Sequence, residues 1–454
     1  MQATGFLRDI WTGLGGSGDA LADVAFEGEG SLPSVFAVSD LATASVAAAA
    51  LAVANVAGSP RPKVRVDRRL ASLWFGTSFR PDGWTPPPAW DPVAGDYQAA
   101  DGWIRLHTNA PRHRAAALAA LGVEPDRDAV QGAVRAWKAE ALEAEVVARG
   151  GCAAAMRSLA DWRAHAQGRA VTTEPLAWTE ITGGGGRSRV PPDPSRPLAG
   201  VRVLDLTRVL AGPTATRFLA GFGAEVLRID PPDWDEPALE PDVTLGKACA
   251  RLDLKGPSGR ERLLALLAET DVLVHGYRPG ALDGLGLDPA TRRRVRPGLV
   301  DVCLDAYGWT GPWAGRRGFD SLVQMSAGIA HRGMVQAGAD RPVPLPVQAL
   351  DHATGYTVAA AVALGLARDR GSQTRVSLAR TAALLAGSAA DAGEDGGGAL
   401  GKPRDADYAE GREATVWGPL MRLRPPASVG AAVMRWDRAA GPLGASLPAW
   451  PGSA

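Results

Sequence analysis

The stretch 198-LAGVRVLDLTRVLAGPTATRFLAGFGAEVLRID-230 decides the fold of this chain. Residues 201–206 form a short apolar run with β-branched side chains, which is typical of a buried strand. An Ala-Gly-Pro loop and a helix-like segment ending at Gly223 follow, and 224–230 has the composition of a second strand. A strand, a helix and another strand with short connections predict a parallel α/β unit.

The same alternation continues beyond this stretch. Residues 257–271 have the pattern of an amphipathic helix with proline in its first turn, and 272–277 and 299–308 have that of strands. We therefore expect an α/β protein with an open, mostly parallel, Rossmann-like sheet and a separate small α/β domain. The loops that follow the strands are 208–212, 230–232, 277–280 and 307–308. Because ligands bind beyond the carboxyl ends of such strands, these loops should meet at the binding edge.

The composition narrows the function classes. The formal net charge is +0, so no long-range field attracts nucleic acid or an anionic membrane, and we expect neither partner. The 3 cysteines lie far apart and form no CxxC pair, which argues against a disulfide scaffold and a metal site. A reducing, cytoplasmic location fits this cysteine use.

One apolar stretch, 41–58, needs a choice between a membrane span and a core helix. It is dominated by alanine, contains Thr, Ser and Asn, and lacks aromatic flanks, so a buried core helix is the better interpretation. The N-terminal segment has no basic region followed by an apolar one, as a secretory signal would.

Two stretches rich in Gly, Pro, Ser and Ala divide the chain, since such compositions offer little to bury. The predicted units are a partial repeat at 1–94, a small α/β domain at 95–182, a linker at 183–197, a large Rossmann-like domain at 198–386, a linker at 387–412, and a C-terminal tail at 413–454 that packs on the large domain.

The partial repeat is an internal echo of the large domain. Residues 36–54 and 347–367 both contain an Asp followed by x-Ala-Thr and an alanine-rich helix, at Asp40 and Asp351. A similar spacing leads from each to an Arg-Val pair and a second helix. This agreement favours duplication over a chance similarity of composition.

Six blocks of the chain, in order, resemble family III CoA-transferases, the superfamily of formyl-CoA transferase, carnitine CoA-transferase and alpha-methylacyl-CoA racemase. They are 198–230, Gly246-Lys247 with 252-LDLK-255, 271-DVLVHGYRPGALDGLGL-287, 306-AYGWTGPW-313, 318-GFDSLVQMSAG-328 and 351-DHATGY-356. The segment from Tyr97 to Gly102 also resembles the family's small domain. That domain follows the Asp-bearing segment in the family but precedes it here, so the chain resembles a permuted or partly duplicated variant.

The resemblance implies an acyl-CoA:carboxylate CoA-transferase. Its substrates would be an acyl-CoA and a free carboxylic acid, with coenzyme A as a substrate and no permanently bound cofactor or metal. Asp351 would form the aspartyl-acyl anhydride and then an aspartyl-CoA thioester. The implied CoA-binding residues are Arg208, Val209, Leu210, Ala211, Gly276, Tyr277, Arg278 and Tyr307. The family commonly places a basic residue near Gly284, which is a glycine here, so Lys247 is a candidate to supply the missing phosphate contact. Family members form interlocked dimers, so a homodimer is expected, with the small domain acting in cis or in trans.

The residues around Asp351 suit this chemistry. A carboxylate with a pKa near ~4 is ionised at neutral pH and needs placement, desolvation and donors for the developing oxyanion. A helix entrance supplies backbone N–H groups and a favourable dipole. Without the resemblance, an N-cap role would be the better interpretation of such an Asp. Asp40 keeps that interpretation, because Ala44 stands where Asp351's segment has Gly355.

Two other functions stay open. An acyl-CoA racemase or isomerase needs a base on each face of the α-carbon. The family's racemases carry a histidine at the position of Phe319, which weakens that alternative. His352 is better interpreted as a local hydrogen-bond partner than as an acid or base. A non-catalytic acyl-CoA-binding protein is the alternative from another class.

Overall fold

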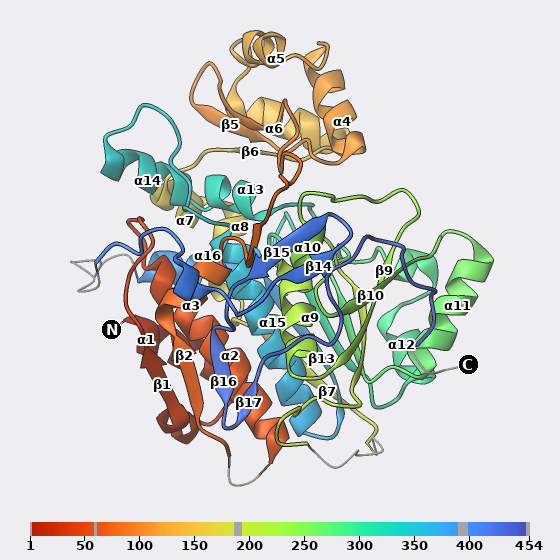
Figure 1. Ribbon diagram of the computed structural model, residues 1–454. Helices are drawn as coiled ribbons and strands as arrows, with labels where there is room; N and C mark the ends of the chain where they lie inside the picture. The colour runs from red at the N-terminus through yellow and green to blue at the C-terminus, as the bar shows by residue number, and fades with distance from the viewer. Residues whose placement is uncertain (1, 59–60, 186–192, 389–397, 451–454) are drawn as a thin grey trace.

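The computed structural model describes residues 2–58, 61–185, 193–388 and 398–450 (Figure 1). Its centre is a seven-stranded sheet of order β10-β9-β8-β11-β12-β13-β7. All neighbouring strands are parallel except β7, which is antiparallel to β13. The strands are β7 (Trp178–Gly183), β8 (Arg202–Leu206), β9 (Glu225–Asp230), β10 (Lys247–Arg251), β11 (Val272–His275), β12 (Val300–Asp305) and β13 (Gly371–Ser377). The predicted α/β class with a mostly parallel sheet is confirmed.

Two strand assignments differ from expectation. The edge strand β10 was not predicted from the sequence, and the chain turns immediately after it. The strand β7 lies inside the predicted small domain but pairs with β13 of the central sheet. Both strands were missed in the sequence because edge strands carry charged and polar residues, which weaken the apolar pattern that identifies a strand.

Both faces of the sheet are buried. Val203 and Val274 face the helices α9 (Ala211–Gly221) and α15 (Ala349–Ala367), whereas Leu204 and Leu273 face α11 (Pro257–Ala268). This explains the continuous apolar strands of the sequence, since a parallel sheet covered on both sides has no polar face.

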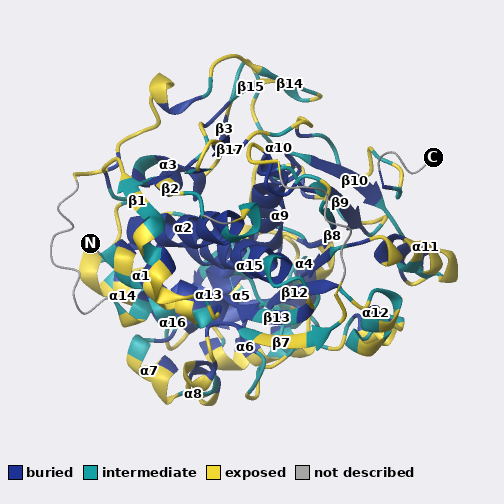
Figure 2. Cartoon of the chain, turned by 90° about the horizontal axis from the view of Figure 1, so that it is seen from below, coloured by how far each residue is buried: buried dark blue, intermediate teal, exposed yellow. Residues whose placement is uncertain are grey.

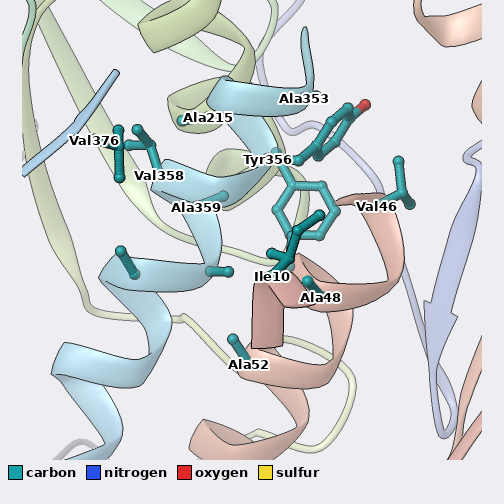
Figure 3. Close-up of a cluster of buried hydrophobic side chains, with 14 of the residues drawn as sticks. Ile10, Val46, Ala48, Ala52, Ala215, Ala353, Tyr356, Val358, Ala359 and Val376 are labelled. Atoms are coloured by element: carbon teal, nitrogen blue, oxygen red, sulfur yellow. The ribbon is translucent and has the colours of Figure 1, made fainter. Parts of the chain in front are cut away.

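The helices α2 (Val38–Ala57) and α15 pack side by side in the middle of the molecule (Figures 1 and 2). Small side chains such as Ala48, Ala52 and Ala359 let them approach, and Tyr356 fills the space between them and α1 (Gln2–Gly13) (Figure 3). By length and hydropathy α2 could cross a membrane, but 83% of its apolar window is buried inside the protein. This degree of burial is typical of a core helix.

The small domain stands at the top of Figure 1. Its sheet has the order β4-β5-β6, with its own apolar core around Tyr97 and Ile104. Its elements are β4 (Gly95–Gln98), β5 (Trp103–Leu106), α4 (Pro111–Leu121), α5 (Arg127–Val134), α6 (Ala139–Ala148) and β6 (Ala153–Ala155). Strands β5 and β6 contact α13 (Asp320–Ser326) of the large domain. The small domain therefore adjoins the segment that leads to Asp351.

The C-terminal tail pairs with the N-terminal region. Its strands β16 (Ala427–Val429) and β17 (Ala432–Val433) extend β1 (Val24–Glu27) and β2 (Val64–Asp67). Strands β14 (Glu413–Thr415) and β15 (Gly418–Arg422) join β3 (Phe79–Pro81). Trp436 and Trp450 also donate hydrogen bonds to the large domain, at Arg217 O (2.9 Å) and Leu266 O (3.2 Å). The tail thus packs on both the N-terminal region and the large domain.

The remaining elements are short. They are η1 (Gly18–Asp23), α3 (Arg68–Trp74), α7 (Leu159–Ala164), α8 (Ala166–Thr173), α10 (Glu240–Val243), η2 (Asp283–Leu285), α12 (Pro289–Val295), α14 (Ile329–Ala337), α16 (Leu378–Gly387) and η4 (Asp405–Asp407). The segments α2-β2-α3 and α15-β13-α16 share one order of helix, strand and helix. The origin of this likeness by duplication or permutation stays a prediction. Residues 186–192 and 389–397 of the two predicted linkers lie outside the described residues.

Candidate active site

A cavity of about 340 Å³ opens where the strand order reverses, between the carboxyl ends of β8 and β11. Open α/β sheets bind their ligands at this switch point. The residues that line it come from the large and the small domain. They are Arg112, His113, Leu206, Thr207, Arg208, Val209, Ala211, Gly212, Trp234, Gly276, Tyr277, Arg278, Ala281, Leu304, Asp305, Ala306, Arg316, Arg317, Gly318, Phe319, Asp351 and Leu378.

Most of the predicted site residues meet in this cavity. The seven that line it are Arg208, Val209, Ala211, Gly276, Tyr277, Arg278 and Asp351. The three that do not are Leu210, Lys247 and Tyr307. The loop assignments after β8 and β11 therefore agree with the geometry, whereas the other three residues need different roles.

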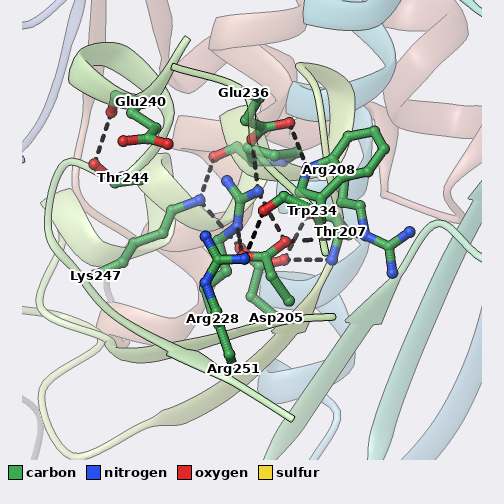
Figure 4. A network of polar contacts seen from close by, with 12 residues as sticks. Asp205, Thr207, Arg208, Arg228, Trp234, Glu236, Glu240, Thr244, Lys247 and Arg251 are labelled. Atoms are coloured by element: carbon green, nitrogen blue, oxygen red, sulfur yellow. Dashed lines mark hydrogen bonds and ion pairs between the residues drawn. The ribbon is translucent and has the colours of Figure 1, made fainter. Parts of the chain in front are cut away.

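Lys247 is a structural residue and its assignment to CoA binding is corrected. Its ammonium group is buried and lies 3.1 Å from the buried carboxylate of Asp205 (Figure 4). It also donates a hydrogen bond to Pro213 O at 3.0 Å. Asp205 in turn accepts hydrogen bonds from the backbone and hydroxyl of Thr207. Lys247 thus stabilises the loop that forms one cavity wall, without reaching a ligand.

Tyr307 and Leu210 are corrected in the same way. Tyr307 is fully buried, with its hydroxyl 3.2 Å from Ser326 Oγ and its ring packed edge-on against Trp313. Leu210 is the residue before the first turn of α9 and lies outside the cavity lining.

Asp351 lies in the first turn of α15, and its side chain borders the cavity while only 7% of the residue is exposed. Within the described residues, no group donates a hydrogen bond to its carboxyl. Its backbone N–H donates to the carboxylate of Asp320, at 2.9 Å, so Asp320 fixes the start of the helix. The carboxyl group is therefore placed by the backbone, and its oxygens are available to a ligand.

Burial raises the pKa of Asp351 well above its usual value, and the Asp320 carboxylate adds to this rise. Burial likewise raises the pKa of Asp320, to about 6. The sequence suggested an ordinary pKa near ~4 for Asp351, and this is corrected. A desolvated carboxylate is a stronger base and a less hydrated nucleophile than one in water.

An aromatic and cationic wall faces the ends of β8, β9 and β11. The guanidinium of Arg208 lies 5.2 Å from the ring centroids of both Trp234 and Tyr277, and it donates a hydrogen bond to the Tyr277 hydroxyl at 2.9 Å. Glu236 accepts from Trp234 Nε1 at 3.1 Å and from the Val209 N–H at 2.9 Å. Flat rings beside a fixed cation suit a nucleotide with phosphates.

The β8–α9 turn is held in a strained shape. Val209 has a φ of 66°, which a β-branched residue rarely adopts. A Cβ on Gly212 would overlap the side chain of Thr207, and a Cβ on Gly355 would overlap the carbonyl oxygen of Ala211. Gly212 lets the β8–α9 turn fold tightly, and Gly355 lets α15 pack closely on α9, which brings Asp351 to the cavity.

Asp40 and His352 lie outside the cavity. Asp40 is fully buried and pairs with Arg68, with Nη1 and Oδ1 at 2.9 Å and Nη2 and Oδ2 at 3.0 Å. It also accepts the Ala3 N–H at 2.9 Å. His352 is buried and stacks on Phe75, with ring centroids 5.2 Å apart. These residues stabilise the core.

Several residues of the cavity lining were not predicted from the sequence. Arg112 and His113 belong to the small domain, and only the tertiary fold brings them to this cavity. Asp305 is the last residue of β12, at the carboxyl end of the strand, and this placement could have identified it. Burial raises the pKa of Asp305 to about 7. Among the described residues, no group of three His, Cys, Asp or Glu could hold a metal ion.

The geometry defines an α/β protein with a nucleotide-sized cavity that is lined by two acidic side chains, Asp305 and Asp351. The sequence profile described as CoA-transferase family III matches residues 198–410. This region, just under half of the chain, is thus similar to CoA-transferase family III.

Known relatives match this region. The chain is 37% identical over 213 residues to acetyl-coenzyme A transferase nodX of Hypoxylon pulicicidum, covering 45% of this chain and 35% of that protein. It is 34% identical over 194 residues to succinyl-CoA:glutarate CoA-transferase of Mus musculus, covering 40% of this chain and 44% of that protein. The crystal structure of Rv3272 from Mycobacterium tuberculosis, orthorhombic form, is 33% identical, covers 42% of this chain and 56% of that one, and has a TM-score of 0.39. The chain spans less than half the length of these two curated relatives.

Proposed function

We propose that this protein is an acyl-CoA:carboxylate CoA-transferase in which Asp351 is the nucleophile. The observation that carries the proposal is the placement of Asp351: a buried carboxyl at the cavity rim, without a cationic partner among the described residues. The match of residues 198–410 to the CoA-transferase family III profile supports the same reaction class.

The reaction runs through two enzyme-bound intermediates. A carboxylate oxygen of Asp351 attacks the thioester carbonyl, the C–S bond breaks, and CoA leaves as the thiolate with an aspartyl-acyl anhydride on the enzyme. The thiolate then attacks the aspartyl carbonyl, the anhydride C–O bond breaks, and the first acid leaves as its carboxylate. The resulting aspartyl-CoA thioester reacts with the second carboxylate by the same two steps in reverse. No proton is gained or lost.

The described residues provide what these steps require. The negative charge of the tetrahedral intermediates can be stabilised by the first backbone N–H groups of α9, whose Ala211 and Gly212 line the cavity. Arg208 and Tyr277 would hold the CoA nucleotide. The raised pKa of Asp351 has a cost, because ionisation must occur before attack. We therefore expect activity to rise with pH across the ionisation of this carboxyl.

Kinetics tests this reaction directly. With an acyl-CoA donor and a free acid acceptor, initial rates should give parallel double-reciprocal lines, the sign of a ping-pong mechanism. Asp351→Ala should abolish exchange and keep the fold. Asp40→Asn should keep the exchange activity, because Asp40 takes no part in the reaction. Intersecting lines, or full activity of Asp351→Ala, would refute the proposal.

Racemisation of an acyl-CoA is the second candidate, because one observation favours it. His113 lines the cavity and its ring lies 5.9 Å from that of Phe319, the position at which racemases of the superfamily carry histidine. Burial lowers the pKa of His113 to about 4, so the ring is neutral, although it is a weaker base than a free imidazole. Wash-in of deuterium at the α-carbon, lost in His113→Ala, would favour this function over transfer.

The proposal also covers the location of the protein and its oligomeric state. We propose a cytoplasmic homodimer, in which the small domain contributes Arg112 and His113 to the cavity of its own chain. A protein that only binds acyl-CoA esters would bind them without exchange, so the kinetic experiment also separates that alternative.

A further inference from the structure

A second carboxyl lines the cavity and takes no part in the proposed transfer steps. It belongs to Asp305, the last residue of β12, and its Oδ1 accepts the backbone N–H of Gly308 at 3.0 Å. Among the described residues, no other group donates a hydrogen bond to this carboxyl, and no basic nitrogen lies within ion-pair distance of it. Asp305 keeps accessible surface, whereas its neighbours Leu304 and Ala306 are buried. Asp305 is therefore open to a molecule in the cavity.

The end of β12 and the start of α15 lie in the same corner of the cavity. The helix α15 packs against β12, and the helix α16 joins their ends. The N–H of Ala379 in α16 donates to the carbonyl of Ala306, at 2.9 Å. The hydroxyl of Thr354, one turn beyond the nucleophile, lies 2.7 Å from that of Thr381 in α16. These contacts hold the two cavity-lining carboxyls on adjoining elements.

Asp305 has the basicity of a proton acceptor. Burial raises the pKa of Asp305 to about 7, the carboxylate of Glu174 adds to this rise, and the hydrogen bond from Gly308 opposes it. A general base works best when its pKa is near the operating pH. A role in the turn alone would not need a charge, since an asparagine accepts the same N–H at a lower cost of burial.

The proposed transfer reaction leaves space near this base. Once the first acid has left, the aspartyl-CoA thioester on Asp351 waits for a second carboxylate. The part of the cavity that the first acid occupied is then open to water. Water that reaches the thioester at this stage competes with the acceptor acid.

We infer that Asp305 activates a water molecule against the aspartyl-CoA thioester, so that the protein also hydrolyses acyl-CoA. The inference rests on the proposed transfer function. Asp305 takes a proton from water, the water oxygen attacks the aspartyl carbonyl, and the C–S bond breaks with CoA leaving as the thiolate. Asp305 returns its proton to the thiolate, and the carboxyl of Asp351 loses its proton to solvent. Each acyl-CoA thus yields an acid anion, free CoA and a proton.

Release of free CoA without an acceptor acid tests the inference. With butyryl-CoA as the only substrate, transfer alone stops at the aspartyl-CoA thioester, whereas hydrolysis should release thiol over many turnovers, which a thiol reagent detects. Exchange of labelled butyrate into butyryl-CoA is measured in parallel. Asp305→Asn should lower the ratio of hydrolysis to exchange by about tenfold or more, because the amide accepts the Gly308 N–H but takes no proton. The control Asp128→Asn, an exposed side chain on α5, should leave the ratio unchanged.

Oxygen labelling separates this route from direct attack of water on the acyl group. In a single turnover in oxygen-18 water, the label should appear on the Asp351 peptide, because the water oxygen adds to the aspartyl carbonyl. The released butyrate should carry no label, since its new oxygen comes from Asp351. Label in the butyrate would show that water attacks the acyl carbonyl, and would overturn the inference.

The remaining outcomes separate this inference from the transfer function. Exchange without thiol release would overturn the inference and leave the transfer function intact. Equal losses of hydrolysis and exchange in Asp305→Asn would also overturn it, since they indicate that the carboxyl only supports the turn. If the wild type catalyses neither reaction, the transfer function fails, and the inference fails with it.

Discussion

The helices α2 and α15 start alike and end in opposite roles. Each carries an Asp in its first turn followed by x-Ala-Thr, and the residues before them have similar backbone angles, φ −74° and ψ 59° at Ala37 and φ −76° and ψ 65° at Gln348. Asp40 is enclosed and paired with Arg68, whereas Asp351 is buried at a cavity rim and unpaired in the described structure.

The comparison teaches that partners, rather than the local motif, decide what such a carboxylate does. A buried carboxylate beside an arginine is neutralised and holds the fold together. The same group without a cation is costly to ionise, and that cost makes sense where a substrate takes the charge. Variants of the two carboxylates and of their helices test this difference in roles.

The largest contrast should be in activity. Asp351→Ala removes the nucleophile and should lower CoA exchange by about a thousandfold or more. Asp40→Ala should leave kcat/KM per folded molecule within about threefold, since Asp40 does not touch the cavity. Steady-state exchange assays, with the folded fraction measured by circular dichroism, provide the test. A similar loss in both variants would remove the distinction.

In stability, removal of the Asp40 carboxylate should have a larger effect than removal of the Asp351 carboxylate. Asp40→Asn leaves the guanidinium of Arg68 buried without its counter-charge and should cost about 3–5 kcal/mol in the free energy of unfolding. Urea denaturation measures this loss. The double variant Asp40→Asn/Arg68→Met should recover part of it, and a single variant as stable as wild type would show that the pair is unimportant.

The packing of α15 on α9 should tolerate less than that of α2. Gly355→Ala places a methyl group against the carbonyl of Ala211, and should cost about 1–3 kcal/mol and lower kcat, because Asp351 shifts with the helix. The matched change Ala44→Gly affects the equivalent position of α2. It should cost only about 0.5–1 kcal/mol through helix propensity and leave kcat intact. Equal kcat values in the two variants would argue against this packing role.

The smallest effect should be a gain in stability that depends on pH. The folded state raises the pKa of Asp351, so its protonation favours folding below the unfolded pKa, and this stability is lost as pH rises through the folded pKa. Asp351→Asn has no such loss. Its melting temperature should therefore exceed that of wild type by a margin that grows with pH. A margin that shrinks with pH would mean that Asp351 is stabilised as the anion.

The sequence predicted the parts of the site that are local in the chain. The run from β8 to β9, the loop with Tyr277 and the helix start at Asp351 were each marked by turn residues next to apolar strands. Lys247 was misassigned because its partner, Asp205, lies 42 residues earlier, and no local pattern reveals that pair. Tyr307 was misassigned because a strand-end position does not tell which way a ring points.

The small-domain contribution was out of reach for a different reason. Arg112 resembles any exposed arginine at a helix start, and only the contact of α13 with β5 and β6 brings its neighbour His113 to Phe319. Contacts between domains depend on the whole fold, so composition and periodicity do not encode them. The raised pKa of Asp351 could not be predicted from the sequence either, because burial and the nearby Asp320 carboxylate together cause it.

Trapping of the covalent intermediate tests whether Asp351 is the nucleophile. The protein is incubated with succinyl-CoA, quenched in acid, digested and analysed by mass spectrometry for a modified carboxyl. The account predicts a CoA thioester on the Asp351 peptide, converted to the hydroxamate by hydroxylamine and absent from Asp351→Ala. An adduct on Asp40 or on any other residue, or rapid exchange without an adduct on Asp351, would contradict it.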